Sequence, residues 1–167
     1  MCKVVLDDAA SAAHPCDGAW VPAVFRTLIV VDNAAFRRSL SELLREHYPT
    51  MLVAQAEDIH AAWKKIREIE PRLVFVDIKL REENGLDLAQ GIRRFHSDVI
   101  IAVVTGHNFP EYRQAAFQNG AHCFLPKDSA VSSDFLSLID SIRGGLPPQW
   151  SLGVDFINPS VGRPWKK

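Results

Sequence analysis

The chain has 167 residues, a length that suits one domain with a single hydrophobic core. Apolar residues make up 47% of the sequence and charged residues 23%, as is ordinary for a globular protein. The formal net charge of -1 excludes a strong overall attraction to nucleic acid or anionic membranes, and no apolar run approaches the roughly 20 residues that a membrane-spanning helix needs.

Residues 1–25 are rich in Ala and Asp and show no regular hydrophobic period, so we expect a loosely ordered leader ahead of the domain. Asp7 and Asp8 interrupt its only short apolar stretch, which is unlike a signal peptide. The chain has three cysteines, an odd number without metal-type spacing: Cys2, Cys16 and Cys123. Free thiols of this kind predict a cytoplasmic protein.

Short apolar runs alternate with amphipathic stretches over residues 26–145, a pattern typical of βαβ units and a parallel sheet. The predicted strands are 28–31, 51–56, 73–76, 100–104 and 123–126. Helical periodicity predicts five helices, whose inward-facing stretches are 36–47, 59–69, 88–95, 112–116 and 135–142. We expect His47, Phe95 and Tyr112 on these inward faces, and a polar loop over 79–84.

Pro126 lies inside the last predicted strand, and proline is tolerated mainly at a sheet edge. Right-handed crossovers with helices on both faces then favour the strand order 2-1-3-4-5. We therefore predict an α/β fold with a doubly wound, five-stranded parallel sheet, in the flavodoxin-like three-layer α/β/α arrangement. The first and third strands would be neighbours at the switch point of the sheet, where such folds bind ligands.

Polar residues follow four of the predicted strands at the point where each strand ends. These residues are Asp32 and Asn33 on the first strand, Asp77 on the third, Thr105 on the fourth and Lys127 on the fifth. Because the carboxyl ends of parallel strands share one edge of a sheet, we expect the five side chains to meet there. Any one of them alone would be an ordinary turn, cap or surface residue.

The chemistry of this set suits a divalent cation and a phosphoryl group. A carboxylate such as Asp77 can attack phosphorus and form an acyl phosphate once nearby cations offset its charge. Oxygen atoms of Asp32, of Asn33 and of the backbone carbonyl of Lys79 are the kind of ligand that Mg²⁺ prefers. Lys127 can pair with a phosphoryl oxygen.

The chain resembles a two-component response-regulator receiver domain over about residues 26–145. The matching segments, in family order, are LIVVDN (28–33), VFVDIKL (74–80), NGLDL (84–88), VVTG (103–106) and GAHCFLPK (120–127).

The resemblance implies a phosphoacceptor module without a separate enzymatic activity, beyond self-catalysed phosphotransfer and autodephosphorylation. Asp77 would accept a phosphoryl group from a phosphohistidine on a sensor histidine kinase or a phosphotransfer protein. Mg²⁺ would bind at Asp77, Asp32, Asn33 and the carbonyl of Lys79.

The resemblance also implies how the phosphoryl group is sensed. Thr105 and Lys127 would contact the phosphoryl oxygens, and Gly106 would leave room beside them. Phe124 matches the aromatic switch position of the family, which turns inward as Thr105 moves toward the phosphoryl group.

Three residues near the site call for separate interpretation. The family usually carries a second acid where this chain has Asn33, so we expect weaker Mg²⁺ binding. Lys79 either replaces part of the lost metal charge or points to solvent. His107, two residues past Thr105, is expected to modulate the lifetime of the phosphate through water access.

Two interpretations of the function remain open. One is a phosphoacceptor in a phosphorelay. The other is a pseudo-receiver that serves as a phosphorylation-independent interaction module, for which Asn33 is the main support. A phosphatase is disfavoured because Lys79 stands where such enzymes carry a second acid, and flavin binding because the loop after Asp32 lacks a phosphate-cradling Gly/Ser/Thr run.

The output is expected to be contact with a downstream protein, without direct DNA binding and without a membrane. The expected contact face, also an option for homodimers, is the fourth helix, fifth strand and fifth helix, with Tyr112, Arg113, Phe117, Phe124 and 133–143.

Residues 146–167 are too few for a DNA-binding domain of roughly 60 residues. This Pro- and Trp-containing tail is either a contact element or a partly ordered end. A kinase would dock near Phe36 and Arg37 and on the loop after Lys127.

Overall fold

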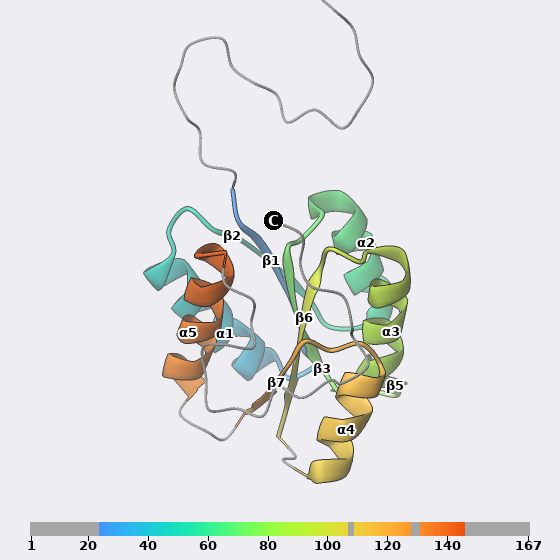
Figure 1. Ribbon diagram of the computed structural model, residues 1–167. Coiled ribbons are helices and arrows are strands. Elements are labelled where there is room, and N and C mark those ends of the chain that lie inside the picture. Colours follow the sequence, from blue (N-terminus) through green and yellow to red (C-terminus); the bar gives the residue numbers. More distant parts are fainter. Residues whose placement is uncertain (1–23, 107–108, 128–130, 146–167) are drawn as a thin grey trace, which may run out of the picture.

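A computed structural model describes residues 24–106, 109–127 and 131–145, which form one parallel sheet covered by helices on both faces (Figure 1). The strands of this sheet are β1 (Arg26–Val30), β2 (Leu52–Ala56), β3 (Leu73–Asp77), β6 (Ile100–Thr105) and β7 (Cys123–Pro126). Their order is β2-β1-β3-β6-β7, and each neighbouring pair is parallel. The predicted order 2-1-3-4-5 is confirmed, and the strand that contains Pro126 lies at an edge.

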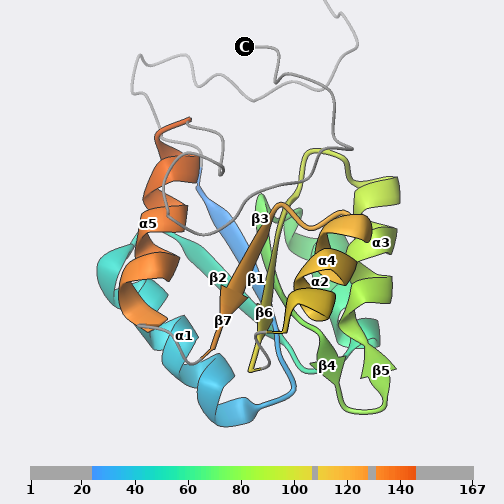
Figure 2. The same ribbon diagram turned by 60° about the horizontal axis from the view of Figure 1, so that its bottom comes forward.

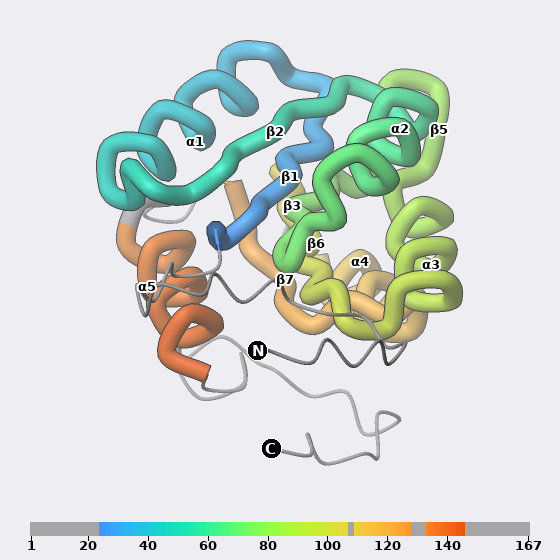
Figure 3. Tube along the Cα trace, turned by 90° about the horizontal axis from the view of Figure 1, so that it is seen from above, coloured from blue at the N-terminus to red at the C-terminus, as the bar shows by residue number. Residues whose placement is uncertain are grey.

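The helices form the two outer layers of the sandwich. They are α1 (Ala34–His47), α2 (Ile59–Ile69), α3 (Gly85–Phe95), α4 (Pro110–Gln118) and α5 (Val131–Arg143). Figure 3 shows α1 and α5 on one side of the sheet and α2, α3 and α4 on the other. The predicted flavodoxin-like three-layer fold is therefore confirmed.

The core is divided by the sheet because successive side chains of a strand point to opposite faces. On β3, Leu73 and Phe75 pack with α1 and α5, whereas Val74 and Val76 pack with α2 and α3. All five residues of β3 are buried. Burial on both faces explains why the strands appear in the sequence as continuous apolar runs and not as alternating patterns.

The segment predicted as a polar loop at 79–84 is instead a small hairpin. It consists of β4 (Lys79–Leu80) and β5 (Glu83–Asn84), which pair antiparallel. Leu80 is fully buried among the side chains of α2 and α3 and anchors the hairpin. Arg81 takes a positive φ of 53° at the turn and forms an ion pair with Glu57.

Three residues predicted on inward helix faces are exposed. His47 is exposed, and the next residue, Tyr48, is buried in its place and donates its hydroxyl to Asp140 over 2.8 Å. Phe95 ends α3 and is 68% exposed, although its ring meets Trp63 at 6.5 Å and the Arg94 guanidinium at 5.5 Å. Tyr112 lies in the first turn of α4 and is 39% exposed.

The predicted leader 1–25 falls outside the described residues except for its last two positions, and the predicted tail 146–167 lies wholly outside them. Both segments remain predictions. Among the described helices, none has the length and apolar character needed to span a bilayer.

Candidate functional site

The strands that carry the predicted polar residues are neighbours in the sheet and end at one edge, where α1 begins and the β4–β5 hairpin projects (Figure 2). Val30 of β1 is level with Val76 of β3, so Asp32 and Asp77 leave neighbouring strands close to each other. At the same edge, on the other side of β3 from β1, the Lys127 amide donates to the Thr105 carbonyl over 2.7 Å. The sheet register therefore places two carboxylates, a hydroxyl and an ammonium at one edge.

Asp77 is the centre of the site. It ends β3, is 3% exposed, and its Oδ2 atom lies 2.5 Å from the Nζ atom of Lys127. Burial raises the pKa of Asp77 above its ordinary value and outweighs the hydrogen bond and charge of Lys127, which lower it; the nearby negative charge of Asp32 adds to the rise. The Asp77 carboxylate therefore lies at the end of a buried strand, with the Lys127 ammonium against one oxygen and the Asp32 carboxylate nearby.

The backbone of Lys79 faces Asp77, whereas its side chain does not. Its amide donates to Asp77 Oδ1 over 3.4 Å, and the residue is exposed. Of the two alternatives predicted for the Lys79 ammonium, the structure favours the one directed to solvent.

Asn33 has a structural role at the start of α1. Its Oδ1 atom accepts a hydrogen bond of 3.0 Å from the Phe36 amide, so Asn33 is the N-cap of α1. The amide oxygen predicted as a metal ligand is thus already engaged with the helix. Asn33 as a ligand stays a proposal.

The side chains at this edge offer oxygen donors to a divalent cation. The described residues contain no group of three His, Cys, Asp or Glu side chains suited to a metal. Asp32 and Asp77 nevertheless offer carboxylate oxygens close enough for the charge of one to raise the pKa of the other. Hard oxygen donors of this kind fit Mg²⁺, which keeps several waters and needs few protein ligands.

We predict that Asn33→Ala lowers the free energy of unfolding by about 1 kcal/mol, because α1 loses its cap. Asn33→Asp keeps a capping oxygen and adds a negative charge beside Asp32, so it should bind Mg²⁺ more tightly than the wild type. Urea denaturation measures the first effect and calorimetric Mg²⁺ titration the second. Tight wild-type binding that Asn33→Asp does not improve would contradict the second expectation.

Arg37 is a site residue that the helical periodicity did not single out. Its guanidinium donates to the carbonyl of Val31 over 2.5 Å and to that of Asp32 over 3.2 Å. Glu57 lies 3.9 Å from Arg37 and 3.0 Å from Arg81 of the hairpin. Arg37 and Glu57 thereby connect the end of β1 to the β4–β5 hairpin. The only sequence feature that could have indicated this role is the position of Arg37, five residues after the strand-end Asp32.

The two predicted switch residues are both inside the molecule. Thr105 is 3% exposed and Phe124 is 2% exposed. The guanidinium of Arg113 on α4 lies 5.5 Å from the centre of the Phe124 ring. The aromatic side chain at this position therefore occupies the inward place in this structure. His107 lies outside the described residues, as do 128–130 of the predicted kinase-docking loop.

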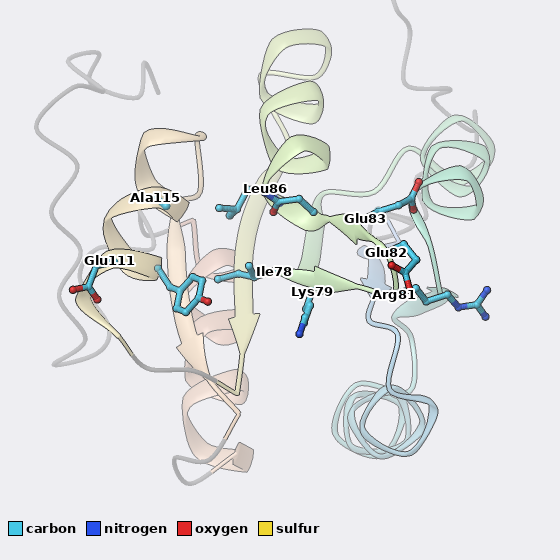
Figure 4. Close-up of a pocket in the computed structure, with 10 residues that line it drawn as sticks. Ile78, Lys79, Arg81, Glu82, Glu83, Leu86, Glu111 and Ala115 are labelled. Atoms are coloured by element: carbon cyan, nitrogen blue, oxygen red, sulfur yellow. The ribbon is translucent and has the colours of Figure 1, made fainter.

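A groove of about 600 Å³ borders the site between the hairpin, the start of α3 and α4 (Figure 4). Ile78, which directly follows Asp77, lines it together with Leu86, Tyr112 and Ala115. Figure 4 shows Arg81 and Glu82 at the hairpin end of this groove and Glu111 at the α4 end. The β4–β5 hairpin begins two residues after Asp77 and forms one wall of the groove. A displacement of the hairpin would consequently alter the shape of the groove.

The chain belongs to the response regulator receiver domain family, whose model matches residues 27–138. It is 31% identical over 104 residues to the sensory transduction protein LytT of Bacillus subtilis. It is also 31% identical over 121 residues to a protein-glutamate methylesterase/protein-glutamine glutaminase of Geobacillus kaustophilus. The crystal structure of a two-component response regulator of the LuxR family from Aurantimonas covers 75% of this chain and 89% of its own, with a TM-score of 0.66 and 26% identity.

The matched regions are only parts of these relatives. They take up 62% of this chain and 42% of LytT, and 71% of this chain and 35% of the methylesterase. The shared part is the receiver domain of two-component signalling, and the predicted family is confirmed.

Proposed function

We propose that this chain is a phosphoacceptor in a phosphorelay, with Asp77 as the residue that is phosphorylated. The observation that carries the proposal is the buried Asp77 carboxylate at the end of β3, paired over 2.5 Å with the Lys127 ammonium. A buried carboxylate that has a cation and a second carboxylate beside it can attack phosphorus and can share a divalent cation with the second carboxylate. Membership of the receiver family supports the same role.

In the proposed reaction, an oxygen of Asp77 attacks the phosphorus of a phosphohistidine on a sensor histidine kinase or phosphotransfer protein. A P–O bond forms, the P–N bond breaks, and the histidine nitrogen keeps the electron pair. Lys127 stabilises charge on the phosphoryl oxygens, and Thr105 donates a hydrogen bond to them. Mg²⁺, which receivers typically use, would be held by Asp32, Asp77, the Lys79 carbonyl and Asn33, and would offset the charge of the incoming phosphoryl group.

The output that we propose is contact with a downstream protein in the cytoplasm, without direct DNA binding by this chain. The proposed contact face is formed by α4, β7 and α5, where Arg113 covers Phe124, and a homodimer through this face is included. Receivers are generally signalling domains and not enzymes, so autodephosphorylation is the only further reaction that we propose. The matched regions make up 42% of LytT and 35% of the methylesterase, so the output of those longer proteins belongs to segments outside the match.

A pseudo-receiver that works without phosphate is the alternative. Two observations favour it: Phe124 is already inside, and the Asn33 oxygen is engaged as a helix cap. In that case, the α4–β7–α5 face would be formed without any signal at Asp77.

The two functions are separated by incubation with acetyl phosphate and Mg²⁺, followed by intact-protein mass spectrometry. We expect the wild type to gain one phosphoryl group and Asp77→Asn to gain none. Asp87→Asn, at an exposed carboxylate in the first turn of α3, is the matched control and should behave as the wild type. No gain in the wild type would favour the pseudo-receiver, and a gain that persists in Asp77→Asn would exclude Asp77 as the acceptor.

A further inference from the structure

The ammonium group of Lys127 is held from two sides. On one side it meets the Asp77 carboxylate, and on the other it lies over the ring of Phe36, with Nζ 5.0 Å from the ring centre. The Lys127 side chain is 17% exposed, so this contact lies partly away from water. Phe36 therefore contacts the cation that the proposed reaction needs.

The ring of Phe36 is itself fixed in position. It packs on Phe135 of α5 at 6.4 Å, and Phe135 packs on Phe75 of β3 at 5.4 Å. Phe75 lies two residues before Asp77 on the same strand. The backbone of Phe36 is fixed as well, since its amide donates to the N-cap oxygen of Asn33.

A cation over an aromatic face is attracted by the negative charge of the ring face, more strongly where water is partly excluded. Lysine has a long, flexible side chain, and holding its ammonium in one place costs rotamer entropy. A ring that is already fixed by the core reduces the freedom of the ammonium in the state before reaction. An aliphatic side chain of similar size would fill the space without attracting the charge.

We propose that Phe36 is a positioning residue for phosphorylation, which holds the Lys127 ammonium beside the Asp77 carboxylate. This inference rests on the proposed phosphoacceptor function. It assigns to Phe36 an effect on the rate of phosphoryl transfer in addition to its contribution to the hydrophobic core.

The test compares Phe36→Leu, Phe36→Tyr and the wild type in their rate of phosphorylation by acetyl phosphate with Mg²⁺. We expect Phe36→Leu to be slower by roughly 3- to 10-fold, as loss of one cation–π contact implies. Phe36→Tyr keeps the aromatic face and should stay within about twofold of the wild type. Leu40→Val, a core truncation one turn further along α1, controls for lost stability and should leave the rate unchanged.

A second comparison shows whether Phe36 acts through Lys127. In a Lys127→Met background, Phe36→Leu should cause no further loss of rate. An unchanged rate in Phe36→Leu, an equal loss in Leu40→Val, or an undiminished loss in the Lys127→Met background would each overturn the proposal.

Failure of the proposed function has a different signature. If the wild type takes up no phosphoryl group, the phosphoacceptor function and the effect of Phe36 on its rate both fail. Urea denaturation of the two single variants and the double variant still measures the Phe36–Lys127 contact, which should change the unfolding equilibrium constant by about threefold or more. Additive effects would show that the contact itself is absent.

Discussion

Gly85→Ala should lower the free energy of unfolding by about 3 kcal/mol or more, the upper range for overpacking. A Cβ atom at this position would lie only 1.7 Å from the carbonyl oxygen of Asp77 and 3.1 Å from a methyl carbon of Val76. The first obstacle is backbone at the end of β3 and cannot rotate away as a side chain would. Relief requires movement of α3 or of the strand that carries Asp77.

Gly106→Ala is the matched control, since a Cβ atom there would meet nothing within 4 Å. It should change the free energy of unfolding by no more than about 0.5 kcal/mol. Urea denaturation of both variants checks the pair. If Gly85→Ala is as stable as Gly106→Ala, α3 does not approach the end of β3 this closely.

The fold could be predicted from the sequence because its strongest constraints are local or topological. Buried parallel strands appear as apolar runs of four to six residues, and Pro126 points to an edge strand by its missing donor. The hairpin over 79–84 was not predicted, because its anchor, Leu80, is one apolar residue in a polar segment. Phe95 and Tyr112 fit the helical period but lie in the last turn of α3 and the first turn of α4, where both side chains are exposed.

The candidate site was predictable to the extent that strand ends determine it. Asp77 and Lys127 meet because β3 and β7 end at the same edge. Contacts between side chains of distant elements carry no sequence pattern, so the ring of Phe36 over Lys127 and the reach of Arg37 to the end of β1 were not predicted. Asn is a common N-cap residue, but an oxygen-bearing side chain beside Asp32 is equally typical of a metal ligand, so residue type alone did not separate the two roles of Asn33.

His122 is a further residue with a role that its sequence position did not reveal. It lies directly before β7, and its Nδ1 atom accepts a hydrogen bond of 3.1 Å from the Ile101 amide, while its own amide donates to the Ile101 carbonyl over 2.8 Å. The imidazole thus takes part in the pairing of β6 and β7. Arg93 brings a guanidinium nitrogen to 3.4 Å from Nε2.

Burial, and secondly the positive charge of Arg93, lower the pKa of His122 from its ordinary value of 6.5 to about 4. Protonation would also place a proton on Nδ1 against the Ile101 amide. In the pH range between 4 and 6.5, the unfolded chain binds a proton at His122 that the folded chain does not. The stabilising contribution is therefore complete above pH 6.5 and is lost as the pH falls toward 4, by about 3 kcal/mol in total.

We expect the wild type to lose about 3 kcal/mol more stability than His122→Asn between pH 6.5 and pH 4, because Asn does not titrate there and its Oδ1 atom can replace Nδ1 as the acceptor. Urea denaturation at a series of pH values measures the difference. Comparing the two proteins cancels the other titrating groups, including Asp77, whose raised pKa gives the opposite slope. Arg93→Gln should raise the pKa of His122, so this variant should lose less stability between pH 6.5 and pH 4 than the wild type. Parallel losses in the wild type and His122→Asn would show that His122 titrates normally and does not hold β6 and β7 together in its neutral form.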